Sequence, residues 1–163
     1  MTMYKNIFGF NTEWGYKNIS ILIFLLILPN FLGMINLPTV MGFKIHFFQI
    51  AIFAAAIKFG PLGGLFSGLV GSFYSAFIMN NPYIVAGNMI LGFFIGFFIR
   101  NGFNIFLSVL IAFTIQVPWL FLTDYYLAGL SLSFIYGLIA ALLVSNLVWA
   151  TLIFLFMIKP NKK

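Results

Sequence analysis

Apolar residues run through this chain in long blocks, broken by short polar or glycine- and proline-containing segments. Six blocks are visible, at residues 19–35, 45–57, 61–79, 83–99, 104–122 and 131–158. A helix needs about 20 apolar residues to cross the hydrocarbon layer of a bilayer. The block at 45–57 is short for this, but Lys44 and Lys58 beside it can extend their charged ends outward. The pattern predicts an all-α integral membrane protein with six transmembrane helices in one domain, residues 1–163.

Small residues recur every fourth position in the blocks on either side of Gly60. Gly60, Gly64 and Gly68 share one side of the predicted helix at 61–79, and Ala51 and Ala55 do so in the preceding block. Bare helix sides let a neighbouring backbone approach closely, which is a main source of helix association in lipid. We therefore expect the helix at 61–79 to be the central, most tightly packed one.

Composition and charge place the chain in a membrane and suggest its orientation. Of 163 residues, 63% are apolar and 6% are charged, whereas about a quarter are charged in soluble domains. Aromatic and basic residues mix in residues 1–18, which suits an interfacial segment. The basic residues on one predicted side are Lys5, Lys17, Lys58, Arg100, Lys159, Lys162 and Lys163, against Lys44 alone on the other. This bias predicts cytoplasmic termini and a multi-pass protein of the cell membrane. Because the basic residues are dispersed at block ends, nucleic acid is not an expected partner.

The side chains that catalysis, metal binding or nucleotide binding require are scarce. There is no cysteine, no phosphate-binding glycine loop followed by Lys-Ser or Lys-Thr, and no His-Glu-x-x-His. The two acids, Glu13 and Asp124, fall on opposite predicted sides of the membrane. Gly129-Leu130-Ser131 loosely fits an intramembrane serine protease, but that chemistry needs a later histidine and the single one is His46. We predict that the chain is not an enzyme and holds no metal or cofactor.

Polar and aromatic residues concentrate in the predicted outer halves of the spans, where a pocket would satisfy them. The candidate substrate-binding residues are Lys44, His46, Gln49, Tyr83, Asn88, Gln116, Trp119, Asp124 and Tyr125. Each has a plainer interpretation. Trp119 and Tyr125 fit an aromatic belt, His46 an interfacial position and Asp124 a solvated loop. Asn88 and Gln116 can instead join neighbouring helices. An aromatic pocket with a few hydrogen-bonding groups suits a small flat heterocycle.

Two motifs give the chain a resemblance to a known family. One is the turn Phe59-Gly60-Pro61-Leu62-Gly63-Gly64 running into Ser67-Gly68-Leu69-Val70-Gly71-Ser72. The other is the Pro82 turn followed by Ala86-Gly87-Asn88-Met89-Ile90-Leu91-Gly92 and Gly96. With its size and six expected spans, the chain resembles the substrate-binding (S) components of energy-coupling factor (ECF) vitamin transporters, from about residue 19 to residue 158.

The resemblance implies a function, partners and a docking face. It implies a binding subunit that captures a vitamin or related heterocycle from outside, capped by the loop at 36–44. The implied partners are a transmembrane coupling subunit and two cytoplasmic ATPases. The implied coupling face lies on the first three helices and includes Ala51, Ala55, Gly60, Gly64 and Gly68. The family's Ala-x-x-x-Ala patch is missing from the first block. The alternative is a non-transporting structural subunit of an envelope or cell-shape complex.

Overall fold

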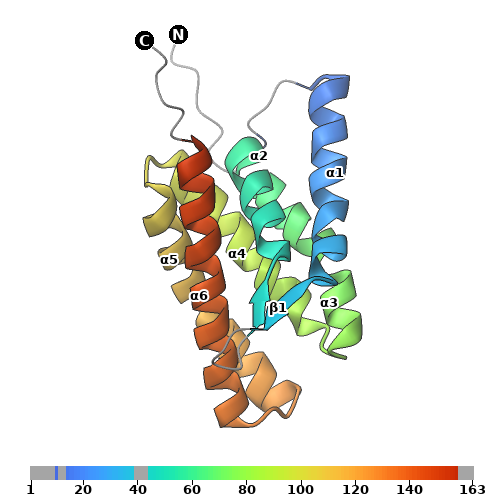
Figure 1. Cartoon of the computed structure of the whole chain (residues 1–163), viewed down its shortest axis with the longest axis vertical. Coiled ribbons are helices and arrows are strands. Elements are labelled where there is room, and N and C mark those ends of the chain that lie inside the picture. The colour runs from blue at the N-terminus through green and yellow to red at the C-terminus, as the bar shows by residue number, and fades with distance from the viewer. Residues whose placement is uncertain (1–9, 11–13, 39–43, 158–163) are drawn as a thin grey trace.

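The protein is a bundle of membrane-length helices with one short hairpin of strands (Figure 1). This computed structural model describes residues 10, 14–38 and 44–157, with the backbone alone for residues 36–38, 44, 45 and 157. In order, the elements are α1 (Tyr16–Gly33), β1 (Asn36–Pro38), β2 (Lys44–His46), α2 (Phe48–Gly71), α3 (Phe73–Ile78), α4 (Tyr83–Arg100), α5 (Ile105–Leu122), the π-helical turn η1 (Thr123–Leu127) and α6 (Leu132–Met157).

Among the described residues, five helical segments are long and apolar enough to cross a membrane. They are Tyr16–Gly33, Phe48–Ile78, Tyr83–Arg100, Ile105–Leu127 and Leu132–Phe156. This confirms the prediction of a helical, multi-pass membrane protein, with helix ends close to those expected. Most of the interfacial segment at 1–18, and the basic residues beyond Met157, lie outside the described residues.

The predicted spans at 45–57 and 61–79 meet at Gly60, where the helical stretch Phe48–Ile78 is interrupted. Phe48–Ile78 runs through Gly60, where the backbone leaves helical geometry at φ 77° and ψ −161°. The two limbs lie against each other: a Cβ built on Gly63 would meet the Ala55 carbonyl oxygen at 2.7 Å. Residues eight apart in a straight helix are separated by about 12 Å. The segment therefore folds back on itself at Gly60 (Figure 1).

The dipeptide Gly60-Pro61 explains this reversal. A backbone with φ near +77° and extended ψ is essentially restricted to glycine. Pro61 disfavours helical geometry in the residue before it and suits the first position of a new helix, where no N–H donor is needed. Arg100 Nη2 donates to the Phe59 carbonyl at 3.4 Å. This bond gives a hydrogen-bond partner to a carbonyl at the end of the first limb, which ends at Gly60.

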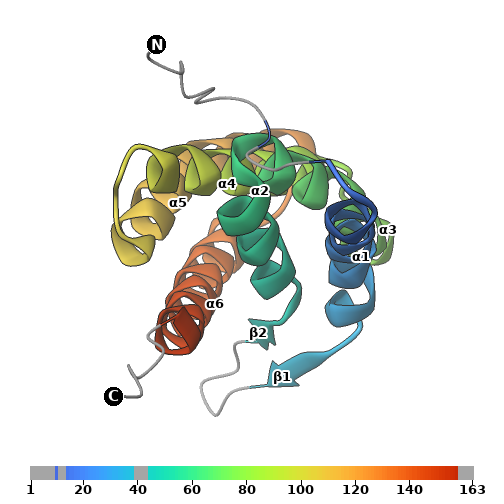
Figure 2. The same cartoon turned by 90° about the horizontal axis from the view of Figure 1, so that it is seen from above.

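We name the two ends of the bundle by their landmarks. The Gly60 end carries Gly60 and Arg100, the start of α1 and the last described turn of α6 (Figure 1). The hairpin end carries β1 and β2, the α3–α4 turn and the α5–α6 connection. Seen from above, α2 lies in the middle of the bundle, with α1 to one side and α4 and α5 to the other (Figure 2).

The small-residue stripe of α2 packs against α4, as the sequence predicts for a central helix. A Cβ built on Gly64 would run into the carbonyl oxygen of Gly92, and one on Gly68 would run into that of Asn88. A Cβ built on Gly96 would lie 2.6 Å from the Gly60 carbonyl carbon. The two backbones are thus nearly in contact along several turns, an approach that side chains would prevent.

The residues expected to form a coupling face are all buried inside the chain. Gly60, Gly64 and Gly68 are covered by α4 and its last residue, Arg100. Ala51 and Ala55 are 1% and 0% exposed and belong to a core cluster with Leu25 of α1. The close approach of helices accounts for the four-residue spacing, and no exposed face remains on these five residues.

Polar side chains attach α1 to α2 and α3. Ser67 Oγ donates to the Leu25 carbonyl at 2.7 Å. Asn30 bridges the break between α2 and α3: its Nδ2 donates to the Val70 carbonyl at 2.8 Å, and its Oδ1 accepts from the Tyr74 N–H at 2.9 Å. These bonds satisfy backbone groups at an interrupted helix, which is necessary where water is excluded.

Short strands occupy part of the segment that the sequence predicts to be a loop at 36–44. β1 and β2 pair antiparallel, with Asn36 opposite His46 and Pro38 opposite Lys44. Residues 39–43, within the cap implied by the family resemblance, lie outside the described residues. The hairpin leads into α2 and brings His46 toward α6, which bears on the site described next.

Candidate functional site

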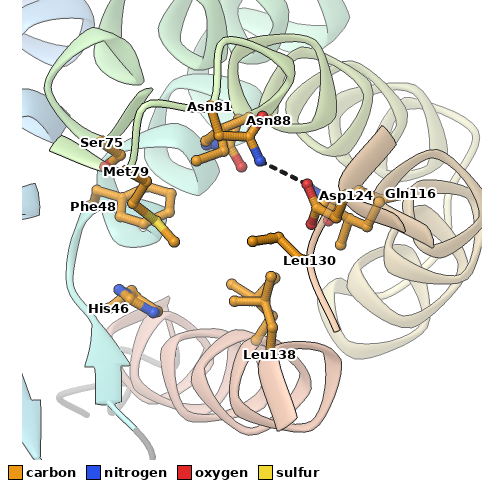
Figure 3. A pocket seen from close by; sticks show the side chains of 13 residues that line it. His46, Phe48, Ser75, Met79, Asn81, Asn88, Gln116, Asp124, Leu130 and Leu138 are labelled. Atoms are coloured by element: carbon orange, nitrogen blue, oxygen red, sulfur yellow. Dashed lines mark hydrogen bonds between the residues drawn. The ribbon is translucent and has the colours of Figure 1, made fainter. Parts of the chain in front are cut away.

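A cavity of about 60 Å³ lies between the helices at the hairpin end (Figure 3). Its wall comes from β2, α2, α3, α4, α5, η1 and α6. The lining residues are His46, Phe48, Ser75, Met79, Asn81, Ile84, Asn88, Gln116, Leu120, Asp124, Leu130, Leu138 and Leu142. The polar side chains among them come from widely separated parts of the sequence, so the tertiary fold assembles the site.

Asn81 links the α3–α4 turn to the carboxylate of the site. The turn is tight, since Asn80 has a positive φ of 48°, which asparagine tolerates better than most residues. Asn81 Oδ1 accepts from the Tyr83 N–H at 3.1 Å, and its Nδ2 donates to Asp124 Oδ1 at 2.7 Å. The buried amide of Asn81 thus bonds both the first residue of α4 and the carboxyl group of Asp124.

The end of α5 presents Gln116, Leu120 and Asp124 along one face. These residues are spaced by four, and all three line the cavity. Pro118 lies within this stretch and the helix widens into a π-helical turn at Thr123–Leu127. Such turns are frequent at functional sites. Asp124 is 1% exposed, so it is a buried group and not the solvated loop charge that the sequence leaves open.

Gln116 has an unsatisfied oxygen at this site. The residue is 2% exposed, and its Oε1 has no hydrogen-bond partner among the described residues. An unpaired buried polar atom costs about 1–3 kcal/mol. A ligand or water in the cavity that donates a hydrogen bond would remove this cost.

Asn88 lies where α4 packs closely against Gly68 of α2. Its Nδ2 donates to Ser72 Oγ at 2.8 Å, and that hydroxyl donates to the Gly68 carbonyl at 2.6 Å. Asn88 therefore both joins the two helices and lines the cavity, so the two interpretations made from the sequence are compatible.

His46 reaches the cavity because β2 is attached to α6. The His46 N–H donates to Ser145 Oγ at 3.3 Å, and Trp149 Nε1 donates to the His46 carbonyl at 2.6 Å. The imidazole lies across the cavity from Asp124 (Figure 3). The cavity thus has a polar wall of amides and a carboxylate, with an imidazole facing it.

Four predicted binding residues line the cavity: His46, Asn88, Gln116 and Asp124. Four others lie elsewhere. Gln49 is buried outside the lining. Trp119 and Tyr83 join α5 to α4 through a 3.2 Å bond from the indole N–H to the Tyr83 carbonyl. Tyr125 is 38% exposed and packs on neighbouring aromatic rings, as in an aromatic belt. The side chain of Lys44 lies outside the described residues.

Sequence reasoning assigned some lining residues to other roles. Asn81, beside Pro82, and Ser75 are polar lining residues that are not among the predicted binding residues. Each of them belongs to a turn or a helix and also lines the cavity. Apolar lining residues such as Phe48 and Leu138 carry no distinguishing signal, since every span is rich in such side chains.

Comparison with known proteins finds no matching family model, no similar curated protein and no similar solved structure. The site must therefore be interpreted from its own geometry. Within the described part of the chain, no three His, Asp or Glu side chains gather into a possible metal site. The cavity offers hydrogen-bond donors and acceptors beside an apolar wall, which is an arrangement suited to binding.

Proposed function

We propose that this chain is the membrane-embedded substrate-binding subunit of an ECF-type importer. It captures a vitamin or related small heterocycle from outside the cell. A transmembrane coupling subunit and two cytoplasmic ATPases then drive its delivery. The observation that carries the proposal is the cavity at the hairpin end, where buried amide and carboxylate groups meet an apolar wall. A few convergent polar groups in an apolar cavity are typical of small-molecule sites.

The proposal includes six membrane passes with the Gly60 end in the cytoplasm. The reversal at Gly60 supports it, because the two limbs of Phe48–Ile78 run in opposite directions. Lys17 lies at the start of α1, Lys58 two residues before Gly60 and Arg100 at the end of α4, whereas Lys44 lies in β2 at the hairpin end. This distribution fits the excess of Lys and Arg on the cytoplasmic side of membrane proteins. With this orientation the cavity opens toward the outside.

Single cysteines test this orientation, since the natural chain has none. We expect Lys58→Cys to be protected from a membrane-impermeant thiol reagent in intact cells, and Phe77→Cys, at the hairpin end, to react. Both should react after permeabilisation. Reaction of the cysteine at position 58 in intact cells would contradict the cytoplasmic placement of the Gly60 end.

The cavity must enlarge to hold a vitamin. Its volume of about 60 Å³ is room for a few waters, whereas sites for drug-sized ligands occupy about 300–1,000 Å³. The connection between η1 and α6 is suited to this movement, since Leu130 lines the cavity next to Gly129, a glycine with φ of 67°. The proposal thus includes an induced widening at the hairpin end.

Ligand-dependent stabilisation of the purified chain tests the proposed function. A panel of vitamins and cofactor precursors is added to the detergent-solubilised protein, and thermal unfolding is followed. A true substrate at a hundredfold excess over Kd should stabilise the fold by about 2.7 kcal/mol. If no compound shifts the transition, the importer function is wrong. Tight co-purification with envelope-synthesis proteins would then favour the structural-subunit alternative.

A further inference from the structure

Among the described residues, the cavity lining holds one carboxyl group, that of Asp124, and no lysine or arginine. When ionised, this group is the negative charge of the polar wall. The described lining residue that can carry a positive charge is His46, whose imidazole lies across the cavity from Asp124 (Figure 3). A buried carboxylate is costly unless it is paired or well hydrogen-bonded.

Hydrogen bonds within the protein use part of the acceptor capacity of Asp124. Asn81 Nδ2 donates to Oδ1 at 2.7 Å. An ionised carboxylate has two oxygens and about four acceptor positions. One neutral donor at one oxygen therefore leaves room for a further donor, and a charged donor would form the stronger bond.

A second acceptor lies two helical turns before Asp124 on the same face. Gln116 Oε1 is buried and has no hydrogen-bond partner within the described part of the chain. Figure 3 shows Gln116 and Asp124 on the same side of the cavity, with Leu130 and Leu138 nearby. The cavity thus offers two acceptors to a ligand from one wall.

Apolar side chains surround the remainder of the space. Phe48, Met79, Leu138 and Leu142 line it. An apolar or aromatic ring can lie against these side chains while a polar edge faces α5. Ligands with carboxylate or phosphate groups are disfavoured, because they would bring like charge close to Asp124 in a water-poor space.

We propose that the ligand is a cationic, nitrogen-containing heterocycle or an arylalkyl amine. Its protonated or permanently charged nitrogen faces Asp124, and an N–H group donates to Gln116 Oε1. Its ring lies against Phe48 and Leu138. This inference rests on the proposed binding function and specifies the charge of the substrate.

Matched probes separate this inference from the proposed function. Benzylamine, benzyl alcohol and benzoate share one ring and differ in charge. Pyridoxamine carries an amine where pyridoxine carries a hydroxyl. Thiamine adds a permanently charged cation to the set, and biotin adds a carboxylate. We expect each cationic probe that binds to bind at least about tenfold more tightly than its neutral or anionic counterpart, measured by thermal shift and calorimetry.

Asp124→Asn tests the role of the carboxylate, because it retains an oxygen to accept from Asn81. We expect it to weaken binding of the cationic probe at least about tenfold and to leave a neutral probe within about threefold. Ser108→Ala is the matched control: Ser108 is fully buried but bonds the Asn104 carbonyl, away from the cavity. It should leave all affinities unchanged. If Asp124→Asn fails to fold, Gln116→Leu and the wild-type charge preference provide the test.

The outcomes are distinguishable. A wild-type chain that binds benzoate, biotin or a neutral probe more tightly than the cations overturns the cationic-ligand inference and leaves the binding function intact. Equal affinity of wild type and Asp124→Asn for the best cation also overturns it. Failure of every probe and every vitamin to bind overturns the binding function itself.

Discussion

Replacing Gly64 by alanine is expected to destabilise the fold by about 1–3 kcal/mol. The added methyl group would collide with the carbonyl of Gly92 on α4. Overpacking of this kind typically costs 1–3 kcal/mol. The obstacle is backbone, so the helices must separate over several turns, and the contacts along the α2–α4 stripe weaken with them. Detergent-induced unfolding of the purified protein, followed by circular dichroism, measures the change.

Gly87→Ala provides the matched control for this prediction. Gly87 also lies within a helix, but a Cβ there would meet its nearest atoms, on Gln116 and Trp119, at 3.4 Å, which is ordinary contact. Alanine is favoured over glycine in a helix by about 1 kcal/mol. We therefore expect Gly87→Ala to be neutral or stabilising. Equal stabilisation by Gly64→Ala would show that α2 and α4 are not in close contact at Gly64.

Replacing Gly60 by alanine is expected to cost about 1–3 kcal/mol for a different reason. The backbone there has φ 77° and ψ −161°, which a residue with a Cβ adopts only under strain. The fold must then either tolerate the strain or lose the reversal between the limbs of Phe48–Ile78. The same unfolding measurement detects the first outcome. Accessibility of a C-terminal cysteine in intact cells detects the second.

Arg100→Ala separates backbone strain from side-chain collision at this position. A Cβ on Gly60 would also run into the Arg100 guanidinium, but a long side chain can move aside. We expect Gly60→Ala to cost nearly the same in the Arg100→Ala background as in the wild type. A double-mutant cycle in which Arg100→Ala removes most of that cost would contradict the backbone explanation.

The fold was largely predictable because its main signals are local. Block length, glycine spacing and turn residues are properties of neighbouring positions, and most helix bounds follow from them. The break between the two limbs was expected from Gly60-Pro61, and the backbone leaves helical geometry at Gly60.

The sequence predicted the location of the candidate site better than it predicted which residues line it. Polar groups in the spans were expected near one end, and His46, Asn88, Gln116 and Asp124 line the cavity there. Tyr125 was misassigned, since adjacent residues near the π-helical turn point in different directions. Asp124 turns inward to Asn81, and Tyr125 outward onto Phe121. Asp124 continues the four-residue spacing of Gln116 and Leu120, and Tyr125, the next residue, falls outside that face.

The sequence by itself determined that this is a helical membrane protein, that α2 has a bare side, and that polar groups collect toward one end. These follow from hydrophobic length and residue size, which depend on the chain alone. Tertiary structure decided that the bare side of α2 is occupied by α4. It also decided that Asn81 from one turn meets Asp124 from another, 43 positions away. Contacts between distant segments depend on how helices rotate and cross, and those angles are set by packing across the whole bundle.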